Sequence, residues 1–491
     1  MKRLFIFAVL GVIAFAILAG AAVSLGGLNQ DEGWYLYAAR LVGEGKLPYR
    51  DFFFTQGPVM PIVYSAAVAV WRSAGLLGAR VLTMLLGAVS IVFAIAFVRR
   101  AVPEDRRSFA AVTVLFLLGG NLYHLYYLAI PKTYALAALF VNAGFFLLTF
   151  RGAGWQFLAG LALALAAGTR ISLGSLLAVC GCCFLFRREW RQLVWFSIGG
   201  FLGLGLVYGP FLANELTRAG LVAAQRYHTA RGGFDPVFTV GSVSRLVRWY
   251  LPVFIVLGLG VHRLATGRRT SRFAVMALLG FAAVFAVQML APFPYEDYQV
   301  PVMALLAVFA TAAFAAGEVQ PARALLLVLG LSWAGAFGCP MLEKWTTNGQ
   351  DRFWTRKKGS TELAQLQEAA TVIETLDPGG GELLTQDLYL AIETGRRVPE
   401  GLEMGPFSYR GENDGVGLSK SELLALLESA PCRIAALSGY SFAITTPRCD
   451  ETAMTDQLEF WRAVKRHYEL VYEMPSFGQN ATTLLILRRK E

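Results

Sequence analysis

Long apolar runs dominate the chain up to about residue 338 and are absent beyond it. Each run is close to the roughly 20 residues that an α-helix needs to cross the hydrocarbon core of a bilayer. Hydropathy therefore predicts about eleven membrane-spanning helices. They cover residues 4–23, 80–98, 109–128, 133–150, 155–168, 171–186, 193–212, 247–261, 273–290, 300–316 and 322–337.

One further apolar run, residues 59–71, contains Pro61 and is too short to span comfortably, so it is either an extra span or an interfacial segment. If it does not cross, all the basic clusters between spans fall on one side, which the positive-inside rule assigns to the cytoplasm. These clusters lie at residues 2–3, 99–107, 151, 187–191 and 263–272. We therefore expect the loops 24–79, 213–246 and 291–299, and everything after 338, to be extracytoplasmic.

The tail has a different pattern, with a helix predicted at 361–376, a strand at 433–437, a helix around 459–467 and a strand at 482–487. Alternating elements of this kind indicate a small α/β domain. The three glycines at 379–381 follow Pro378 and predict a turn. The predicted architecture is a polytopic α-helical membrane domain, residues 1–338, followed by a soluble extracytoplasmic α/β domain, residues 339–491.

The composition agrees with a membrane protein, because 56% hydrophobic and 16% charged residues are untypical of a soluble protein. The net charge of +10 comes from arginines in short clusters between apolar runs, which act as topology signals, so no nucleic-acid partner is expected.

Cys180, Cys182 and Cys183 lie inside an apolar run and are expected to pack rather than bind metal. Cys432 and Cys449 could form a disulfide if the tail is extracytoplasmic.

Two adjacent acids, Asp31 and Glu32, follow the first predicted span. Acids at a membrane boundary are costly unless they are hydrated or paired, which favours a functional site. The same residues also fit the cap and first turn of an amphipathic helix, where acids stabilise the helix dipole. The pair alone leaves both interpretations open.

The rest of the first loop carries several weak motifs in a defined order. They are an amphipathic helix ending near Gly45, Tyr-Arg-Asp-Phe at 49–52, Gln-Gly-Pro at 56–58, a short apolar helix and Gly-Ala-Arg at 78–80. This order resembles the dolichyl-phosphate-mannose protein mannosyltransferases and their bacterial relatives, including the lipid A aminoarabinose transferases, which share the GT-C membrane fold. The resemblance covers residues 1 to about 338. Many members have two consecutive prolines where this chain has Gly57 and Pro58.

The resemblance implies an inverting glycosyltransferase of the plasma membrane. Such an enzyme moves a sugar from a polyprenyl phosphate to a hydroxyl of a glycan, lipid or protein acceptor at the extracytoplasmic face. It also implies that Asp31 is catalytic, with Glu32 beside it. A carboxylate there could act as general base toward the acceptor. Further substrate-binding residues expected in the first loop are Tyr35, Tyr49, Asp51 and Gln56.

Cations for the donor phosphate are expected at outward helix ends, where Lys132 and Arg170 lie. The alternative is that both side chains only snorkel at a helix boundary. A third, weaker set is Arg226, Tyr227 and His228 in the loop 213–246.

The turn at 292–301 resembles the tyrosine-rich turn that these transferases carry before a late helix. Its Glu296, Asp297 and Tyr298 could bind sugar hydroxyls or phosphate, or anchor the interface. No cofactor is certain, although a divalent metal ion could bridge Asp31, Glu32 and the phosphate.

Two other function classes fit parts of the pattern. A transporter or flippase of lipid-linked sugars would favour broken helices and charged residues near mid-membrane, whereas the acids here cluster at one surface. A non-catalytic protein that only binds glycan would use the same outward loops. Nucleotide-driven chemistry is disfavoured, because no GxxxxGK[ST] loop is present.

Overall fold

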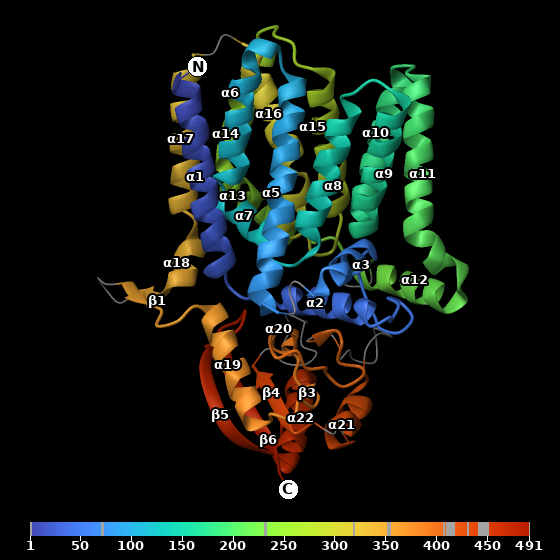
Figure 1. Ribbon diagram of the computed structural model, residues 1–491, viewed down its shortest axis with the longest axis vertical. Coiled ribbons are helices and arrows are strands. Elements are labelled where there is room, and N and C mark those ends of the chain that lie inside the picture. The colour runs from blue at the N-terminus through green and yellow to red at the C-terminus, as the bar shows by residue number, and fades with distance from the viewer. Residues whose placement is uncertain are drawn as a thin grey trace.

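The computed structural model describes residues 2–69, 73–229, 233–317, 320–350, 355–405, 408, 418–429, 432–439 and 451–490. A bundle of long helices stands upright in Figure 1, with the N-terminus at one end and a small mixed domain beyond the other end. Helices α2 (Gln30–Gly43), α3 (Val59–Ala66) and α12 (Glu215–Thr229) lie across the bundle end that faces this domain. The position of α3 agrees with the interfacial interpretation of the apolar run at 59–71.

The bundle contains an apolar helix at each predicted position. Its helices are α1 (Lys2–Ser24), α5 (Gly75–Ala101), α6 (Arg107–Val114), α7 (Leu122–Ala129), α8 (Thr133–Leu148), α9 (Ala153–Thr169), α10 (Ser175–Phe186), α11 (Trp190–Ala213), α13 (Pro236–Trp249), α14 (Leu251–Ala265), α15 (Arg272–Met289), α16 (Met303–Ala315) and α17 (Pro321–Phe337). Within the described residues, six helices are long and apolar enough to cross a membrane, or up to eight if each of two bent pairs is one span. The predicted multi-pass helical membrane protein is confirmed, and the number of spans stays a prediction.

Two of the predicted spans are interrupted. The run 109–128 forms α6, a π-helical turn (Leu115–Gly119) and α7, with a bend of 69°, because Asn121 caps the new helix by accepting the His124 N–H at 2.9 Å. The run 247–261 is divided between α13 and α14, which meet at 86°. Pro252 lies in the first turn of α14, where its missing N–H costs nothing. Hydropathy alone does not register such breaks.

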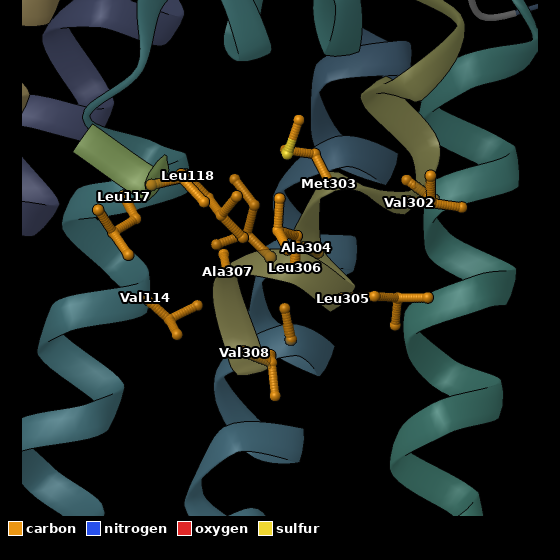
Figure 2. Close-up of a cluster of buried hydrophobic side chains, with 14 of the residues drawn as sticks. Val114, Leu117, Leu118, Val302, Met303, Ala304, Leu305, Leu306, Ala307 and Val308 are labelled. Atoms are coloured by element: carbon orange, nitrogen blue, oxygen red, sulfur yellow. The ribbon is translucent and has the colours of Figure 1, made fainter. Parts of the chain in front are cut away.

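The centre of the bundle is α16, whose residues are all buried and, apart from Thr311, apolar. A helix of this kind has to be surrounded by others. Figure 2 shows side chains from Val302 to Val308 packed beside Val114, Leu117 and Leu118. The 3-10 helix η4 (Glu296–Val302) runs directly into α16 and therefore has a rigid support.

The tail begins with α18 (Pro340–Thr346) and a small antiparallel pair, β1 (Thr347–Gln350) with β2 (Thr355–Lys357). Its main sheet has the order β3-β4-β6-β5, with β3 parallel to β4 and the other pairs antiparallel. The strands are β3 (Leu383–Leu384), β4 (Ile434–Ser438), β5 (Tyr468–Phe477) and β6 (Thr482–Arg489), and the helices are α19 (Glu362–Leu376), α20 (Leu388–Glu393), α21 (Lys420–Ser429) and α22 (Glu451–His467).

The predicted small α/β domain is thus confirmed, including the two strands, the two helices and the glycine turn, in which Gly380 has a φ of 73°. Strand β5 was not predicted. It is mostly exposed and lacks an apolar run, so only its hairpin pairing with β6 defines it. The predicted pairing of Cys432 with Cys449 is not tested, since Cys449 lies outside the described residues.

Helix α2 shares one hydrophobic core with the tail. The Gln30 side-chain amide donates to Asp387 Oδ1 at 2.6 Å, and the Tyr37 hydroxyl accepts the Val398 N–H at 3.0 Å. The two backbones approach so closely that a Cβ on Gly33 would lie 2.2 Å from the Tyr389 nitrogen. The tail is therefore fastened to the helix that carries Asp31.

Gly33→Ala is expected to destabilise the protein, although alanine normally stabilises a helix interior by about 1 kcal/mol relative to glycine. The added methyl group would collide with the backbone of α20, and overpacking typically costs about 1–3 kcal/mol. Gly20→Ala is the matched control, because a Cβ there has nothing within 4 Å. Thermal unfolding in detergent should show a lower Tm for Gly33→Ala only. Equal Tm values for the two variants would contradict the close packing of α2 on α20.

Candidate active site

A cavity of about 80 Å³ lies where α2, the bundle end and the tail meet. Segments far apart in the sequence line it, since α2, three interhelical segments, α12, η4 and the tail each contribute. The lining residues are Asp31, Trp34, Tyr35, Thr55, Gln56, Lys132, Arg170, Tyr227, Tyr298 and Met404. Seven of these ten were predicted as site residues, namely Asp31, Tyr35, Gln56, Lys132, Arg170, Tyr227 and Tyr298.

Asp31 is placed by the capping of α2. The Asn29 side chain accepts the Asp31 N–H at 3.0 Å, and the Glu32 carboxylate accepts the Asn29 N–H at 3.0 Å, which together form a capping box. Asn29 is thus the cap, and the Asp31 carboxylate is left for other contacts. Its Oδ2 lies 2.6 Å from the Lys132 ammonium.

Lys132 lies between two carboxylates. Its Nζ is also 3.3 Å from Asp297 Oδ2, and the same oxygen accepts the Tyr134 hydroxyl at 2.7 Å. Burial disfavours the ammonium, but the groups around it, Asp31 first and Asp297 among the others, together outweigh burial and hold the pKa of Lys132 well above its usual value. Lys132 therefore provides a fixed positive charge in the lining of the cavity.

Arg170 is the second buried cation of the site, with 7% of its surface exposed. Its guanidinium lies over the rings of Tyr298 and Tyr134, with its carbon 4.7 and 5.0 Å from the ring centres, and its Nη1 donates to Thr133 Oγ1 at 3.2 Å. Its Nε is buried and has no acceptor among the described residues. A buried arginine with an unused donor beside a cavity is suited to binding an anion.

Tyr35 lies on the same face of α2 as Asp31, one turn further along. Burial, reinforced by the charge of Asp31, raises the pKa of Tyr35. The phenol therefore stays protonated and can donate a hydrogen bond to an oxygen in the cavity.

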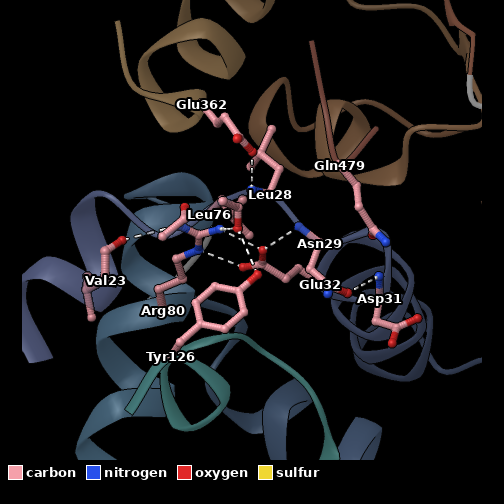
Figure 3. A network of polar contacts seen from close by, with 12 residues as sticks. Val23, Leu28, Asn29, Asp31, Glu32, Leu76, Arg80, Tyr126, Glu362 and Gln479 are labelled. Carbon is pink, nitrogen blue, oxygen red and sulfur yellow. Dashed lines mark hydrogen bonds and ion pairs between the residues drawn. The ribbon is translucent and has the colours of Figure 1, made fainter. Parts of the chain in front are cut away.

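Glu32 has a different environment from Asp31. It forms a bidentate ion pair with Arg80, with both distances 2.7 Å and both side chains fully buried. Arg80 also donates to the carbonyl oxygens of Gly26 and Gly27 at 2.8 and 2.9 Å. Figure 3 shows this network, with the Asp31 carboxylate pointing away from it. Glu32 and Arg80 hold the segment that joins α1 to α2.

The other predicted site residues lie around the cavity rather than in its lining. Tyr49 is buried and donates to the Gln56 carbonyl. Asp51 pairs with Arg50 at 2.8 Å, and this hydrogen bond holds the pKa of Asp51 below its usual range. Glu296 pairs with Arg245 at 3.0 Å.

Of the predicted residues of α12, Tyr227 lines the cavity. Arg226 is exposed and does not line the cavity. The side chain of His228 lies outside the described part of the chain.

Several site residues were missed by sequence reasoning. They are Trp34, Thr55, Tyr134 and Met404. Tyr134 follows Lys132 by two positions and Trp34 follows Asp31 by three, so proximity to a predicted residue was an available signal for both. Met404 carries no such signal, since it lies far along the chain in the tail.

The side chains around Asp31 do not form a set of ligands that fits a metal ion held by the protein. The Lys132 ammonium already lies against the carboxylates of Asp31 and Asp297. Among the described residues, no three His, Cys, Asp or Glu side chains come together as metal ligands.

No model of a known protein family and no curated protein sequence matches the chain. Several solved structures, however, are similar to the chain. ArnT from Cupriavidus metallidurans, bound to undecaprenyl phosphate, is 14% identical, with a TM-score of 0.63 over 98% of this chain and 97% of its own. The apo structure of the same protein has a TM-score of 0.61. The Archaeoglobus fulgidus oligosaccharyltransferase, in complex with Zn and sulfate, is 12% identical, with a TM-score of 0.53 over 96% of this chain and 72% of its own.

These similarities extend over the tail as well as the bundle, so they concern the whole architecture. The chain therefore has the GT-C fold of multi-pass membrane glycosyltransferases, as the order of motifs in its first loop predicted. Because the sequences are only 12–14% identical, the likeness establishes the fold alone.

Proposed function

We propose that this protein is a glycosyltransferase that moves a sugar from a polyprenyl-phosphate donor to an acceptor hydroxyl at the extracytoplasmic face of the membrane. The observation that carries the proposal is the 2.6 Å contact between Asp31 and Lys132 in a cavity that Arg170 also lines. A carboxylate that can act as a base and two cations that can bind phosphate thus line one cavity, which supports the proposal. The ArnT structure with undecaprenyl phosphate supports this donor class, and so does a structure of the Archaeoglobus fulgidus oligosaccharyltransferase AglB with dolichol phosphate.

In the proposed reaction the acceptor oxygen forms a bond to the anomeric carbon while the bond from that carbon to the phosphate oxygen breaks. Asp31 takes the acceptor proton as positive charge develops on the sugar. The polyprenyl phosphate leaves as an anion, and Lys132 and Arg170 stabilise its charge. Tyr35 and Tyr298 can donate hydrogen bonds to sugar or phosphate oxygens. No step is assigned to a metal ion, because the side chains around Asp31 do not form a set of ligands that fits one.

The cavity is smaller than the roughly 300 Å³ at which small-molecule pockets begin. Donor binding therefore requires neighbouring segments to move apart. Among the described residues, Met404 is the one that the tail contributes to the lining, so movement of the tail relative to α2 is one way to enlarge the site.

The distribution of arginines supports the proposed extracytoplasmic position. The cavity that contains Asp31 and the cavity lined by Arg106, Arg268 and Arg269 lie at opposite ends of the bundle. The positive-inside rule assigns the arginine-rich end to the cytoplasm. The active site and the tail then face outward from the plasma membrane, where the acceptor is a glycan, a lipid or a protein.

The alternative is a transporter or flippase of lipid-linked sugars. The two bent helix pairs favour it, since broken helices are common in transporters. Purified protein in liposomes separates the two functions. Movement of the labelled lipid across the bilayer without any covalent product would identify the flippase and overturn the proposed transferase.

Lys132→Ala and Arg170→Ala are each expected to lower kcat/KM for transfer by about 10²-fold, because each removes a preorganised charge from the leaving phosphate. The measurement uses purified protein with a panel of polyprenyl phosphates that carry labelled mannose, glucose, galactose or aminoarabinose. Mass analysis of envelope glycans from a deletion strain would select the natural sugar and acceptor.

Arg245→Ala is the matched control, since Arg245 pairs with Glu296 near the site but does not line the cavity. Its kcat/KM should stay within a few fold of wild type. If Lys132→Ala and Arg170→Ala behaved like this control, the phosphate assignment would be wrong.

A further inference from the structure

A second polar cavity, of about 220 Å³, lies at the end of the bundle opposite Asp31. It is formed by the end of α5, the end of α16, the segment before α6 and the loop between α14 and α15. Its lining residues are Ala101, Pro103, Asp105, Arg106, Arg268, Arg269, Thr270, Ser271, Ala312, Ala315, Ala316 and Gly317. This cavity takes no part in the proposed transfer reaction.

Positive charge predominates in this cavity. Arg106, Arg268 and Arg269 line it together with one acid, Asp105, which lies 3.1 Å from Arg106. Arg268 and Arg269 are exposed and form no ion pair with any described residue. The described lining therefore has two guanidinium groups in excess of its carboxylates.

The remaining polar groups also suit an anion. Thr270 Oγ1 is buried and has no hydrogen-bond partner among the described residues. Next to it, Ser271 caps α15 by accepting the Phe273 N–H at 3.2 Å, so the positive end of the α15 dipole lies at the cavity. An unused hydroxyl, a helix N-terminus and arginines form a set of groups that binds phosphate.

The apolar lining and the position of the cavity indicate which phosphate compound would bind. Ala101, Ala312, Ala315 and Ala316 belong to the ends of α5 and α16, and their small side chains leave the hollow between these helices. The cavity thus combines a cationic rim with an apolar floor at the end of membrane-spanning helices. Basic pockets between helices on the cytoplasmic side are typical sites for anionic lipid headgroups.

We propose that this cavity binds the phosphate of an anionic phospholipid from the cytoplasmic leaflet. The lipid phosphodiester pairs with Arg268 and Arg269, Thr270 donates a hydrogen bond to it, and the glycerol backbone lies against the alanines. The basic residues of this loop then have a binding function in addition to their effect on topology.

The test is lipid binding by the purified full-length protein, measured by native mass spectrometry and by thermal shift. Phosphatidylglycerol is compared with phosphatidylcholine and with inorganic phosphate. The wild type is expected to retain phosphatidylglycerol selectively and to gain Tm from it. The double variant Arg268→Gln/Arg269→Gln should bind it about tenfold more weakly or worse.

Arg151→Gln/Arg187→Gln is the matched control, because these two arginines are exposed at the same end of the bundle and do not line the cavity. It removes the same charge, so any general effect on topology or bilayer attraction is shared. Equal loss of binding in both double variants would overturn the proposal. Stabilisation by inorganic phosphate but not by phosphatidylglycerol would overturn the assignment to a lipid.

The lipid assay is independent of the proposed sugar transfer, since it contains no donor or acceptor. Arg268→Gln/Arg269→Gln is expected to stay monodisperse in gel filtration, because both side chains are exposed.

Discussion

Asp31→Asn is expected to reduce sugar transfer by about 10²–10⁴-fold in kcat, since an amide of the same shape cannot take up the acceptor proton. Donor binding should be retained or strengthened. The Lys132 ammonium now lies 2.6 Å from Asp31 Oδ2, and loss of this charge leaves it available to the donor phosphate. The measurement is kcat and KM for labelled transfer, with donor affinity determined separately by displacement of polyprenyl phosphate.

Asp51→Asn is the matched control for this substitution. Asp51 lies in the same loop, carries the same charge and pairs with Arg50 without lining the cavity. Its kcat should be close to that of wild type. A normal kcat for Asp31→Asn would rule out Asp31 as the base. Asp297, which holds Lys132 from the other side at 3.3 Å, would then be the carboxylate to test.

The second large effect is expected at the ion pair between Glu32 and Arg80. Removing one partner of a buried pair leaves an uncompensated charge and typically costs about 3–5 kcal/mol. Arg80→Leu should cost at least as much as Glu32→Gln, because Arg80 also satisfies the carbonyl oxygens of Gly26 and Gly27. Thermal unfolding in detergent should therefore show a large loss of Tm for both variants.

Kinetics on the same variants distinguish a role in positioning from one in chemistry. If Glu32 positions α2, the double variant Glu32→Gln/Arg80→Met should recover part of the lost stability, and activity should follow the folded fraction. If Glu32 acts on substrate, Glu32→Gln should lose kcat even at temperatures where it is fully folded. Arg488→Gln is the control, since it breaks an exposed pair with Glu469 and should change stability by about 1 kcal/mol or less.

The residues of the site were largely accessible from sequence. Asp31, Lys132 and Arg170 stand out because a charged side chain next to a long apolar run has few inexpensive environments. That reasoning depends only on local sequence, and for Asp31 it left a helix cap open until the resemblance of the first-loop motifs favoured a catalytic role. It could not assign partners, so it treated Asp31 and Glu32 as one acidic pair, whereas the structure gives the first to Lys132 and the second to Arg80.

In the fold, too, some elements are defined by their local sequence and others by contacts between distant segments. Apolar runs of membrane length define α1, α5 and α11, since burial in lipid depends on the residues of each segment alone. Strand β5 has no comparable local signal and exists through its pairing with β6. The bend between α13 and α14 was missed because mean hydropathy is insensitive to where a helix is interrupted.

The sequence by itself determined that the chain is a multi-pass helical membrane protein with an α/β tail and that charged residues gather at the ends of its helices. These properties follow from the cost of placing each segment in lipid or water. Only the tertiary structure decided that Lys132 lies between Asp31 and Asp297 and that Met404 of the tail closes the same cavity. Such contacts join residues far apart in the chain, and they form only when the packing of α2, η4 and the tail brings these residues together.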